Sequence, residues 1–152
     1  MNAPTVIDTK NKIGQQLLSK GLISIDQLDI ALTEQKKNGL ILGEVLVGLG
    51  FISESVMRDV LSQVLGIASV DLANVVPDKS ALDLIKKEIA ERYTIVPVSF
   101  EEGHQRLKIA MKNASDLMIL DRVHALVGRK IELVPMVAGS SEIKKAIDQF
   151  YG

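Results

Sequence analysis

The chain has 152 residues, 47% of them hydrophobic, which is enough for one ordinary domain or two small ones with buried cores. Its 18 basic and 19 acidic residues balance, which argues against broad electrostatic capture of nucleic acid or anionic lipid. Cysteine is absent, which excludes disulfides, thiolate metal sites and cysteine nucleophiles. No apolar run reaches the ~18 residues of a membrane span and no signal-peptide pattern opens the chain, so we expect a cytoplasmic protein.

Residues 1–11 show no sustained hydrophobic period and are expected to form a flexible arm. Residues 12–68 then contain an internal repeat, in which glycine, serine and apolar positions recur 29 residues apart. The polar landmarks of the repeat pair Gly14 with Gly43, Gly21 with Gly50, and Ser24 with Ser53. A fixed offset of this kind indicates two copies of one structural unit.

Each copy is predicted to be a helical hairpin. In the first copy, Gly21 can end a short helix in the left-handed conformation, and Ser24 can cap a second helix that ends near residues 38–39. Gln27 completes a capping box with Ser24, and Ile23 and Leu28 have the spacing of a hydrophobic staple.

The second copy follows the same plan, with one difference. Gly50 ends its first helix, Ser53 caps its second, and Ile52 and Met57 form the staple. Val56 stands where the first copy has glutamine, so no capping box is expected here. The two copies predict four short helices with short connections.

Residues 69–152 predict an α+β subdomain. The expected order is a connection over 71–80 leading into a helix through 91, strands over 94–100 and 106–111, a helix over 115–127, a strand over 130–137 and a helix over 140–150. Pro97 argues that the first strand lies at a sheet edge. The fold class is therefore α+β, with duplicated helical hairpins followed by a small three-stranded mixed sheet that carries its helices on one face.

Signals for catalysis are weak. The sequence contains no phosphate loop, zinc-protease motif, nucleophile elbow or dinucleotide fingerprint. His104 and His124 have no neighbouring motif and are interpreted as a solvated turn residue and a helix-surface residue. We expect no catalytic residue and no bound metal.

Residues 12–35, KIGQQLLSKGLISIDQLDIALTEQ, resemble the motif RLGxxLLxxGLIxxxxLxxxLxxQ. This motif is typical of the MshEN-like N-terminal domain of type II secretion and type IV pilus assembly ATPases, the group of GspE, PilB and MshE. The later segments LIKKEIAERYTIVPV (84–98), LKIAMKN (107–113) and EIKKAIDQFY (142–151) resemble further elements of the same family. The resemblance covers residues 12–151.

The resemblance implies a non-enzymatic regulatory and docking domain of a hexameric motor. Its expected partners are the cytoplasmic domain of an inner-membrane platform protein and an attached ATPase domain, so recruitment to the inner membrane face is expected. The sequence stops at Gly152 before any phosphate loop, which suggests either one domain of a longer ATPase or a stand-alone homologue.

Several members of the family bind cyclic di-GMP through the duplicated motif, and two copies of one unit could each hold half of this near-symmetric ligand. The resemblance implies phosphate approach at Gly14 and Gly43, each expected at a helix N-terminus, charge from Lys12 and a guanine contact from Gln35. The full implied site comprises Lys12, Ile13, Gly14, Leu17, Leu18, Gly21, Leu28, Leu32, Gln35, Leu42, Gly43, Leu46, Val47, Gly50, Met57, Leu61 and Gln63. The apolar members also have the helical spacing that a four-helix core requires.

The sequence departs from the family motif at four positions. Lys12 replaces arginine, Ile41 occupies the basic position of the second copy, and Asn113 stands where an acidic residue is common. The closing glutamine position of the second copy is Val64, with Gln63 about 100° round the helix. Half of the ligand would therefore lack polar partners.

Three functions remain in competition. The first is a non-enzymatic regulatory and docking domain, for which cyclic di-GMP binding is left open, and the second is a cyclic di-GMP sensor. The third, a small enzyme without a recognised motif, would require a pocket of converging groups with perturbed pKa values.

Overall fold

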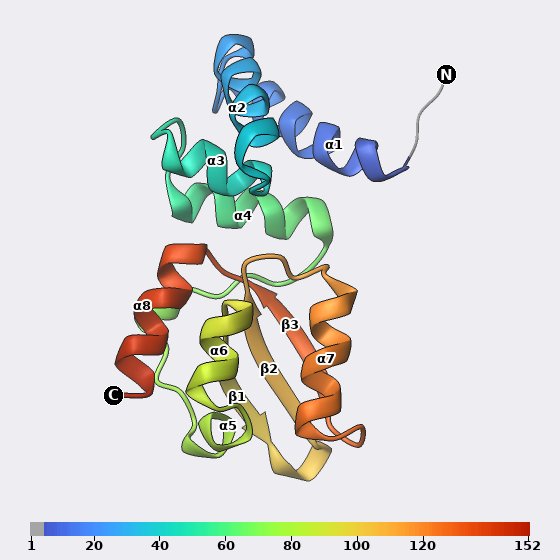
Figure 1. Cartoon of the computed structure of the whole chain (residues 1–152), viewed down its shortest axis with the longest axis vertical. Helices are drawn as coiled ribbons and strands as arrows, with labels where there is room; N and C mark the ends of the chain where they lie inside the picture. Colours follow the sequence, from blue (N-terminus) through green and yellow to red (C-terminus); the bar gives the residue numbers. More distant parts are fainter. Residues whose placement is uncertain (1–4) are drawn as a thin grey trace. The chain divides into compact units, whose positions relative to one another are not determined.

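The computed structural model describes residues 5–152, with side chains from Lys12 onward. It divides into two compact units (Figure 1), unit 1 up to Gly66 and unit 2 from Ile67 to Gly152. The sequence places this boundary slightly later, after residue 68.

Unit 1 consists of α1 (Thr5–Ser19), α2 (Ile25–Asn38), α3 (Leu42–Gly48) and α4 (Glu54–Leu65). The predicted arm is wrong over residues 5–11, because α1 begins at Thr5. Pro4 disfavours helix for the residue before it, and no proline follows until Pro77, so the chain can become helical directly after Pro4. Residues 1–4 of the predicted arm lie outside the described residues.

The turns between the helices of each copy match. Gly21 and Gly50 both adopt the left-handed conformation, with φ of 71° and 78°. The Leu22 N–H donates to the Leu17 carbonyl at 2.9 Å, and the Phe51 N–H donates to the Leu46 carbonyl at 3.0 Å. These two hydrogen bonds are 29 residues apart and satisfy carbonyls that a helix end otherwise leaves without a partner. The predicted glycine terminators are confirmed.

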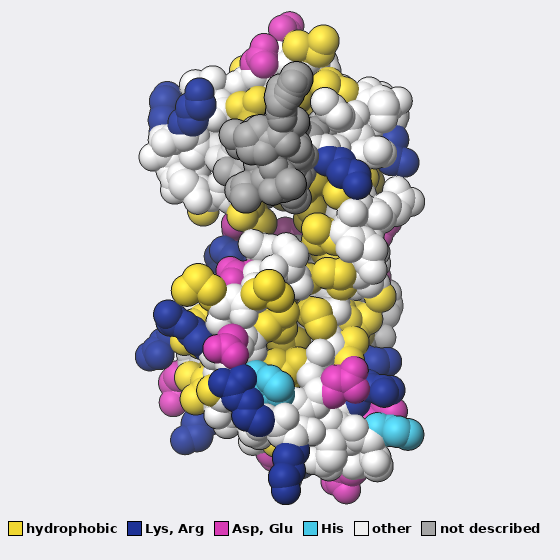
Figure 2. Space-filling model, turned by 90° about the vertical axis from the view of Figure 1, so that its right-hand side faces the viewer, with side chains coloured by type: hydrophobic (Ala, Val, Ile, Leu, Met, Phe, Trp, Pro, Cys, Tyr) yellow, Lys and Arg dark blue, Asp and Glu magenta, His cyan; other side chains and the backbone are white. Residues whose placement is uncertain are grey.

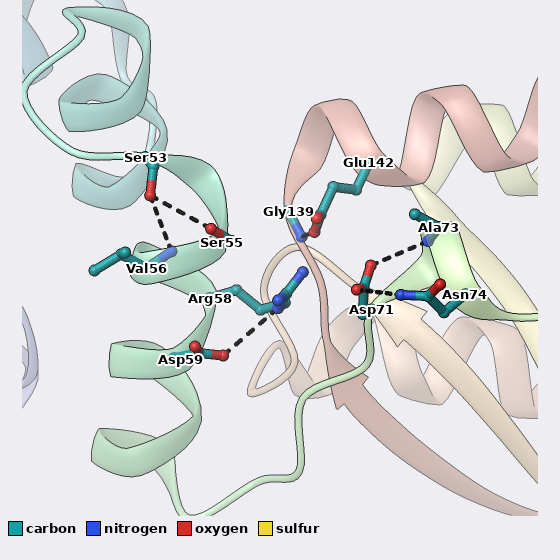
Figure 3. A network of polar contacts seen from close by, with 10 residues as sticks. All are labelled: Ser53, Ser55, Val56, Arg58, Asp59, Asp71, Ala73, Asn74, Gly139 and Glu142. Carbon is teal, nitrogen blue, oxygen red and sulfur yellow. Dashed lines mark hydrogen bonds and ion pairs between the residues drawn. The ribbon is translucent and has the colours of Figure 1, made fainter.

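The predicted caps are confirmed as well. The Gln27 N–H donates to Ser24 Oγ at 3.1 Å, and the Ser24 N–H donates to Gln27 Oε1 at 2.9 Å, which completes the capping box. In the second copy the Val56 N–H donates to Ser53 Oγ at 3.2 Å, and valine offers no reciprocal acceptor (Figure 3).

The two copies differ at their outer ends. Helix α1 has 15 residues whereas α3 has 7. Helix α2 ends at the left-handed Gly39, but α4 ends at the left-handed Gly66, two residues before the position that the repeat would give. The two copies thus have the same structure at their turns and at the apolar positions that face each other, and they differ at the outer ends of their helices.

The helices of unit 1 pair across the two copies. Helix α1 packs against α4, and α2 packs against α3. Helix α1 of the first copy corresponds to α3 of the second, and α2 corresponds to α4. Exchanging the copies therefore converts the α1–α4 contact into the α2–α3 contact, as a two-fold rotation would. All four helices share one apolar core, built around Leu17, Ile23, Ala31, Leu42, Val45, Leu46, Met57 and Val60.

Unit 2 is built on a sheet of β1 (Ile95–Glu101), β2 (Arg106–Met111) and β3 (Glu132–Val137), in that order. Strands β1 and β2 are antiparallel, whereas β2 and β3 are parallel. Pro97 and Pro135 lie in the two outer strands, where a missing N–H costs no interior ladder bond. The predicted mixed sheet and the edge position of β1 are confirmed.

The helical segments of unit 2 are η1 (Leu72–Asn74), α5 (Lys79–Leu84), α6 (Lys87–Tyr93), η2 (Glu102–His104), α7 (Leu117–Val127) and α8 (Ser140–Phe150). Helices α5, α6 and α8 contact β1, and α7 contacts β3. Figure 1 shows α6 and α7 over the same face of the sheet. Asp71 caps η1 through the Ala73 N–H at 3.2 Å, and Glu142 accepts the Gly139 N–H at 2.9 Å at the start of α8 (Figure 3).

The single helix predicted to run from residue 80 through 91 is wrong, because Ile85 breaks it into α5 and α6. Ile85 is extended, with φ −127° and ψ 117°, and its side chain is only 2% exposed. The Tyr151 hydroxyl donates to the Ile85 carbonyl at 2.7 Å. This distant partner compensates the carbonyl at the break.

No helix in residues 5–152 has both the length and the hydropathy that crossing a membrane requires.

Replacing Gly50 with alanine is expected to lower the free energy of unfolding of unit 1 by about 1–2 kcal/mol, because a Cβ is disfavoured in the left-handed conformation. The matched control is Gly48→Ala at the last residue of α3, where an added Cβ meets nothing within 4 Å. Gly48→Ala should raise the free energy of unfolding by up to ~1 kcal/mol, because alanine has a higher helix propensity than glycine. Urea unfolding followed by circular dichroism measures both. Equal effects would contradict the assigned turn.

Replacing Tyr151 with phenylalanine is expected to lower stability by about 1 kcal/mol at neutral pH, through loss of the hydrogen bond to Ile85. Burial raises the pKa of Tyr151 from 10.0 to about 12. Between pH 10.0 and about 12 the Tyr151 hydroxyl is protonated in the folded protein but ionised in the unfolded chain. The free energy of unfolding therefore declines as pH rises through this range.

The variant Tyr151→Phe should lack this part of the alkaline decline. Tyr93→Phe is the matched control and should keep it, because neighbouring Arg122 and Arg92 lower the pKa of Tyr93. Identical pH profiles for wild type and Tyr151→Phe would refute the prediction.

Candidate functional site

The duplicated glycines allow close packing between helices. A Cβ added to Gly14 would lie 3.3 Å from both δ carbons of Leu28, and one added to Gly43 would lie 3.3 Å from Met57 Cγ. The expectation that Gly14 lies at a helix N-terminus is wrong, since α1 starts at Thr5 and Gly14 lies in its interior. Gly43 does lie in the first turn of α3, but it is buried.

Burial divides the predicted apolar site residues into two groups. Leu17, Leu42, Leu46 and Met57 are at most 4% exposed and form the core of unit 1. The remaining apolar members pack against that core and are partly exposed: Ile13, Leu18, Leu28, Leu32, Val47 and Leu61. Only the second group offers accessible surface in the described state.

The polar members of the predicted site lie on different helices. Lys12 is exposed on α1, Gln35 is half-buried in the last turns of α2, and Gln63 is exposed on α4. Val64 packs against the core of unit 1, so the glutamine beside it points to another side of α4. The turn residues Gly21 and Gly50 are exposed.

A hollow of about 330 Å³ lies where α2 ends. It is lined by Leu32, Gln35, Lys36, Gly39 and Leu40. Two of these residues belong to the predicted site, and the other three were missed. The signal that could have found them is the helix stop at Gly39, which turns Leu40 back beside the last turn of α2.

The hollow contains both apolar and polar groups. Leu40 is 42% exposed, and Leu32 is half-buried. Gln35 can donate and accept hydrogen bonds through its side-chain amide, and Lys36 contributes a positive charge. Such a lining suits a ligand with a flat apolar face and polar edges.

Other chemistry has little support in the described residues. Residues 12–152 contain no group of three or more His, Asp or Glu side chains that could hold a metal ion. His104 is exposed in η2, with its Nδ1 3.5 Å from Glu101 Oε2. His124 lies on α7 with Nε2 buried and without a hydrogen-bond partner in the described structure.

Residues 65–152 match the family model of the MshEN domain. The chain is 35% identical over 140 residues to the type IV pilus assembly ATPase PilB of Myxococcus xanthus, covering 92% of this chain and 24% of that protein. It is 40% identical over 93 residues to PilB of Thermus thermophilus, covering 60% of this chain and 10% of that protein. The chain thus spans at most about a quarter of the length of these curated relatives.

Two solved structures are similar. A structure of MshE with cyclic di-GMP has a TM-score of 0.75 and 27% identity, and the match covers 91% of this chain and 98% of that one. The N-terminal domain of XpsE has a TM-score of 0.76, with both chains covered completely, and at 23% identity this likeness concerns the fold alone. The chain belongs to the MshEN domain family, the N-terminal and non-catalytic domains of type II secretion and type IV pilus assembly ATPases.

Proposed function

We propose that unit 1 binds cyclic di-GMP, and that the chain thereby regulates a pilus-assembly or secretion ATPase to which it is joined. One observation supports this above others, namely the pairing of α1 with α4 and of α2 with α3. Because exchange of the copies reproduces this pairing, unit 1 has two similar halves. A ligand with two equivalent nucleotide halves can use such an arrangement twice.

The similarity to MshE supports the same proposal. That protein was determined with cyclic di-GMP, and it shares 27% identity with this chain along nearly its whole length. The accessible motif residues Leu32 and Gln35 line the hollow at the end of α2. Stacking against leucine and an amide hydrogen bond would suit a guanine, whose edge carries both donors and acceptors.

The two copies would contribute unequally. The first copy retains Lys12 and Gln35, whereas the second has Ile41 and Val64 at the equivalent positions. A nucleotide half placed against the second copy would lose hydrogen bonds with water that Ile41 and Val64 cannot replace, which costs free energy. We therefore expect micromolar binding.

Isothermal titration calorimetry of the whole chain with cyclic di-GMP tests this function. Gln35→Ala should raise Kd about tenfold, because one hydrogen-bonded base contact contributes about 1–3 kcal/mol. The matched control is Gln149→Ala, an exposed glutamine of α8 in unit 2, which should leave Kd unchanged. Absence of binding heat for the wild type at high ligand excess would refute the proposal.

A second proposed function is docking to the cytoplasmic domain of an inner-membrane platform protein. The observation that favours it is the apolar surface of α7, where Leu117, Met118 and Leu126 are 77%, 68% and 59% exposed. Figure 2 looks onto the side of unit 2 that carries α7 and shows hydrophobic side chains gathered there, with basic side chains nearby. Several large exposed apolar residues on one helix indicate an interaction surface more strongly than scattered ones.

The surroundings of α7 suggest the chemistry of the partner. Arg122 of α7 and Arg92 of α6 are close enough to the Tyr93 hydroxyl to lower its pKa. Two guanidinium groups are therefore close together beside the apolar residues. A partner surface with an apolar centre and acidic edge would complement them.

Leu126→Asp should weaken binding of the platform protein's cytoplasmic domain at least about tenfold, because it places a carboxylate within the apolar contact. Val76→Asp is the matched control, since Val76 is 91% exposed and lies in the loop before α5. Surface plasmon resonance with the immobilised partner domain measures both variants. Equal loss in both, or no loss in Leu126→Asp, would remove α7 from the interface.

A further inference from the structure

The second copy of the repeat lacks the cation that a phosphate requires. Position 41, equivalent to Lys12, is isoleucine, and Ile41 precedes α3 without a side-chain capping bond. Helix α3 has seven residues, and its first turn is buried around Leu42 and Gly43. A phosphate near this end of unit 1 would therefore need a positive charge from another element.

The end of α2 brings such a charge to this place. Lys36 lies in the last turn of α2, which ends at Asn38, and Gly39 turns the chain with φ 71°. Only Gly39 and Leu40 then separate α2 from Ile41 and the start of α3. Lys36 and Leu40 line the same hollow, so a lysine from the first copy lies beside the point where the second copy begins.

The surroundings leave Lys36 available for an anion. Within residues 12–152 no acidic side chain forms an ion pair with Lys36, and the residue is exposed. The C-terminal end of α2 carries partial negative charge from its last carbonyls. This partial negative charge repels a phosphate unless a cation offsets it. The ammonium group of Lys36 is therefore what would allow an anion to bind at this helix end.

The hollow is of a suitable size for part of the ligand. At about 330 Å³ it lies at the lower end of the range for small-molecule sites, enough for a portion of a dinucleotide. Leu32 and Leu40 supply apolar contact, and Gln35 supplies a hydrogen-bonding amide. Lys36 is the only charged residue among the described residues that line this hollow.

We propose that Lys36 binds a phosphate of the dinucleotide and thereby replaces the cation that Ile41 does not provide. This inference rests on the proposed binding of cyclic di-GMP to unit 1. It assigns a specificity residue outside the 17 positions that the duplicated motif implies. It also predicts that the hollow at the end of α2 is occupied in the complex.

Calorimetry with cyclic di-GMP on the whole chain tests this assignment. Lys36→Ala should raise Kd about tenfold or more, since a hydrogen bond to a charged group contributes about 1.5–3 kcal/mol. Lys37→Ala is the matched control, because it removes the same charge one residue further along α2 but does not line the hollow. It should change Kd by less than about twofold, and Lys36→Arg should bind like the wild type.

A charge relocation provides the sharper test. Ile41→Arg restores the cation of the family motif, so adding it to Lys36→Ala should recover most of the lost affinity. Added to the wild type, the same change should have a smaller effect, because Lys36 already supplies the charge.

The outcomes separate the two proposals. No binding heat for the wild type would overturn the cyclic di-GMP function and this inference with it. Wild-type binding with equal Kd values for Lys36→Ala and Lys37→Ala would overturn the role of Lys36 alone. Thermal unfolding of each variant, followed by circular dichroism, verifies that a loss of binding does not come from a loss of fold.

Discussion

The packing of each helix of unit 1 against a helix of the other copy is the interaction on which the rest of this unit depends. Helices of seven to fifteen residues are marginal alone, and their stability must come from burial of an apolar face. Helix α1 finds that burial on α4, and α2 finds it on α3. Within each copy, glycine at position 14 or 43 lets the side chain of Leu28 or Met57 approach closely, so the two helices of a hairpin also touch. Duplication of the hairpin thus supplies the partner that a single hairpin lacks.

Features that local chemistry controls could be predicted from the sequence. The left-handed turn at Gly21, the capping box of Ser24 and Gln27, and the edge position of the strand containing Pro97 each follow from one residue type and its immediate neighbours. The break at Ile85 could not be predicted, because its carbonyl partner is Tyr151, 66 residues away in the chain.

The candidate site was predictable only in part, for the same reason. Leucines at motif spacing could belong to a core or to a binding surface, and only tertiary packing separates buried Leu17 from half-exposed Leu32. The place of Lys36 beside Leu40 depends on the direction in which the chain leaves Gly39, which the predicted helix end alone does not specify. Sequence reasoning identified the repeat unit but not the hollow at its edge.

The two copies of the repeat share the positions that folding requires. Positions that form the turns and the core still correspond between the copies, as Gly21 with Gly50 and Leu17 with Leu46 do.

A paramagnetic distance measurement tests the two-fold pairing most directly, since the cysteine-free chain accepts spin labels at chosen positions. One doubly labelled variant carries labels at Ser19 and Ser55, and the other carries labels at Gly48 and Asp26. Ser19 corresponds to Gly48 and Ser55 to Asp26 in the repeat, so exchanging the copies converts one pair into the other. Two-fold pairing predicts the same distance distribution for both pairs, and clearly different distributions would contradict it.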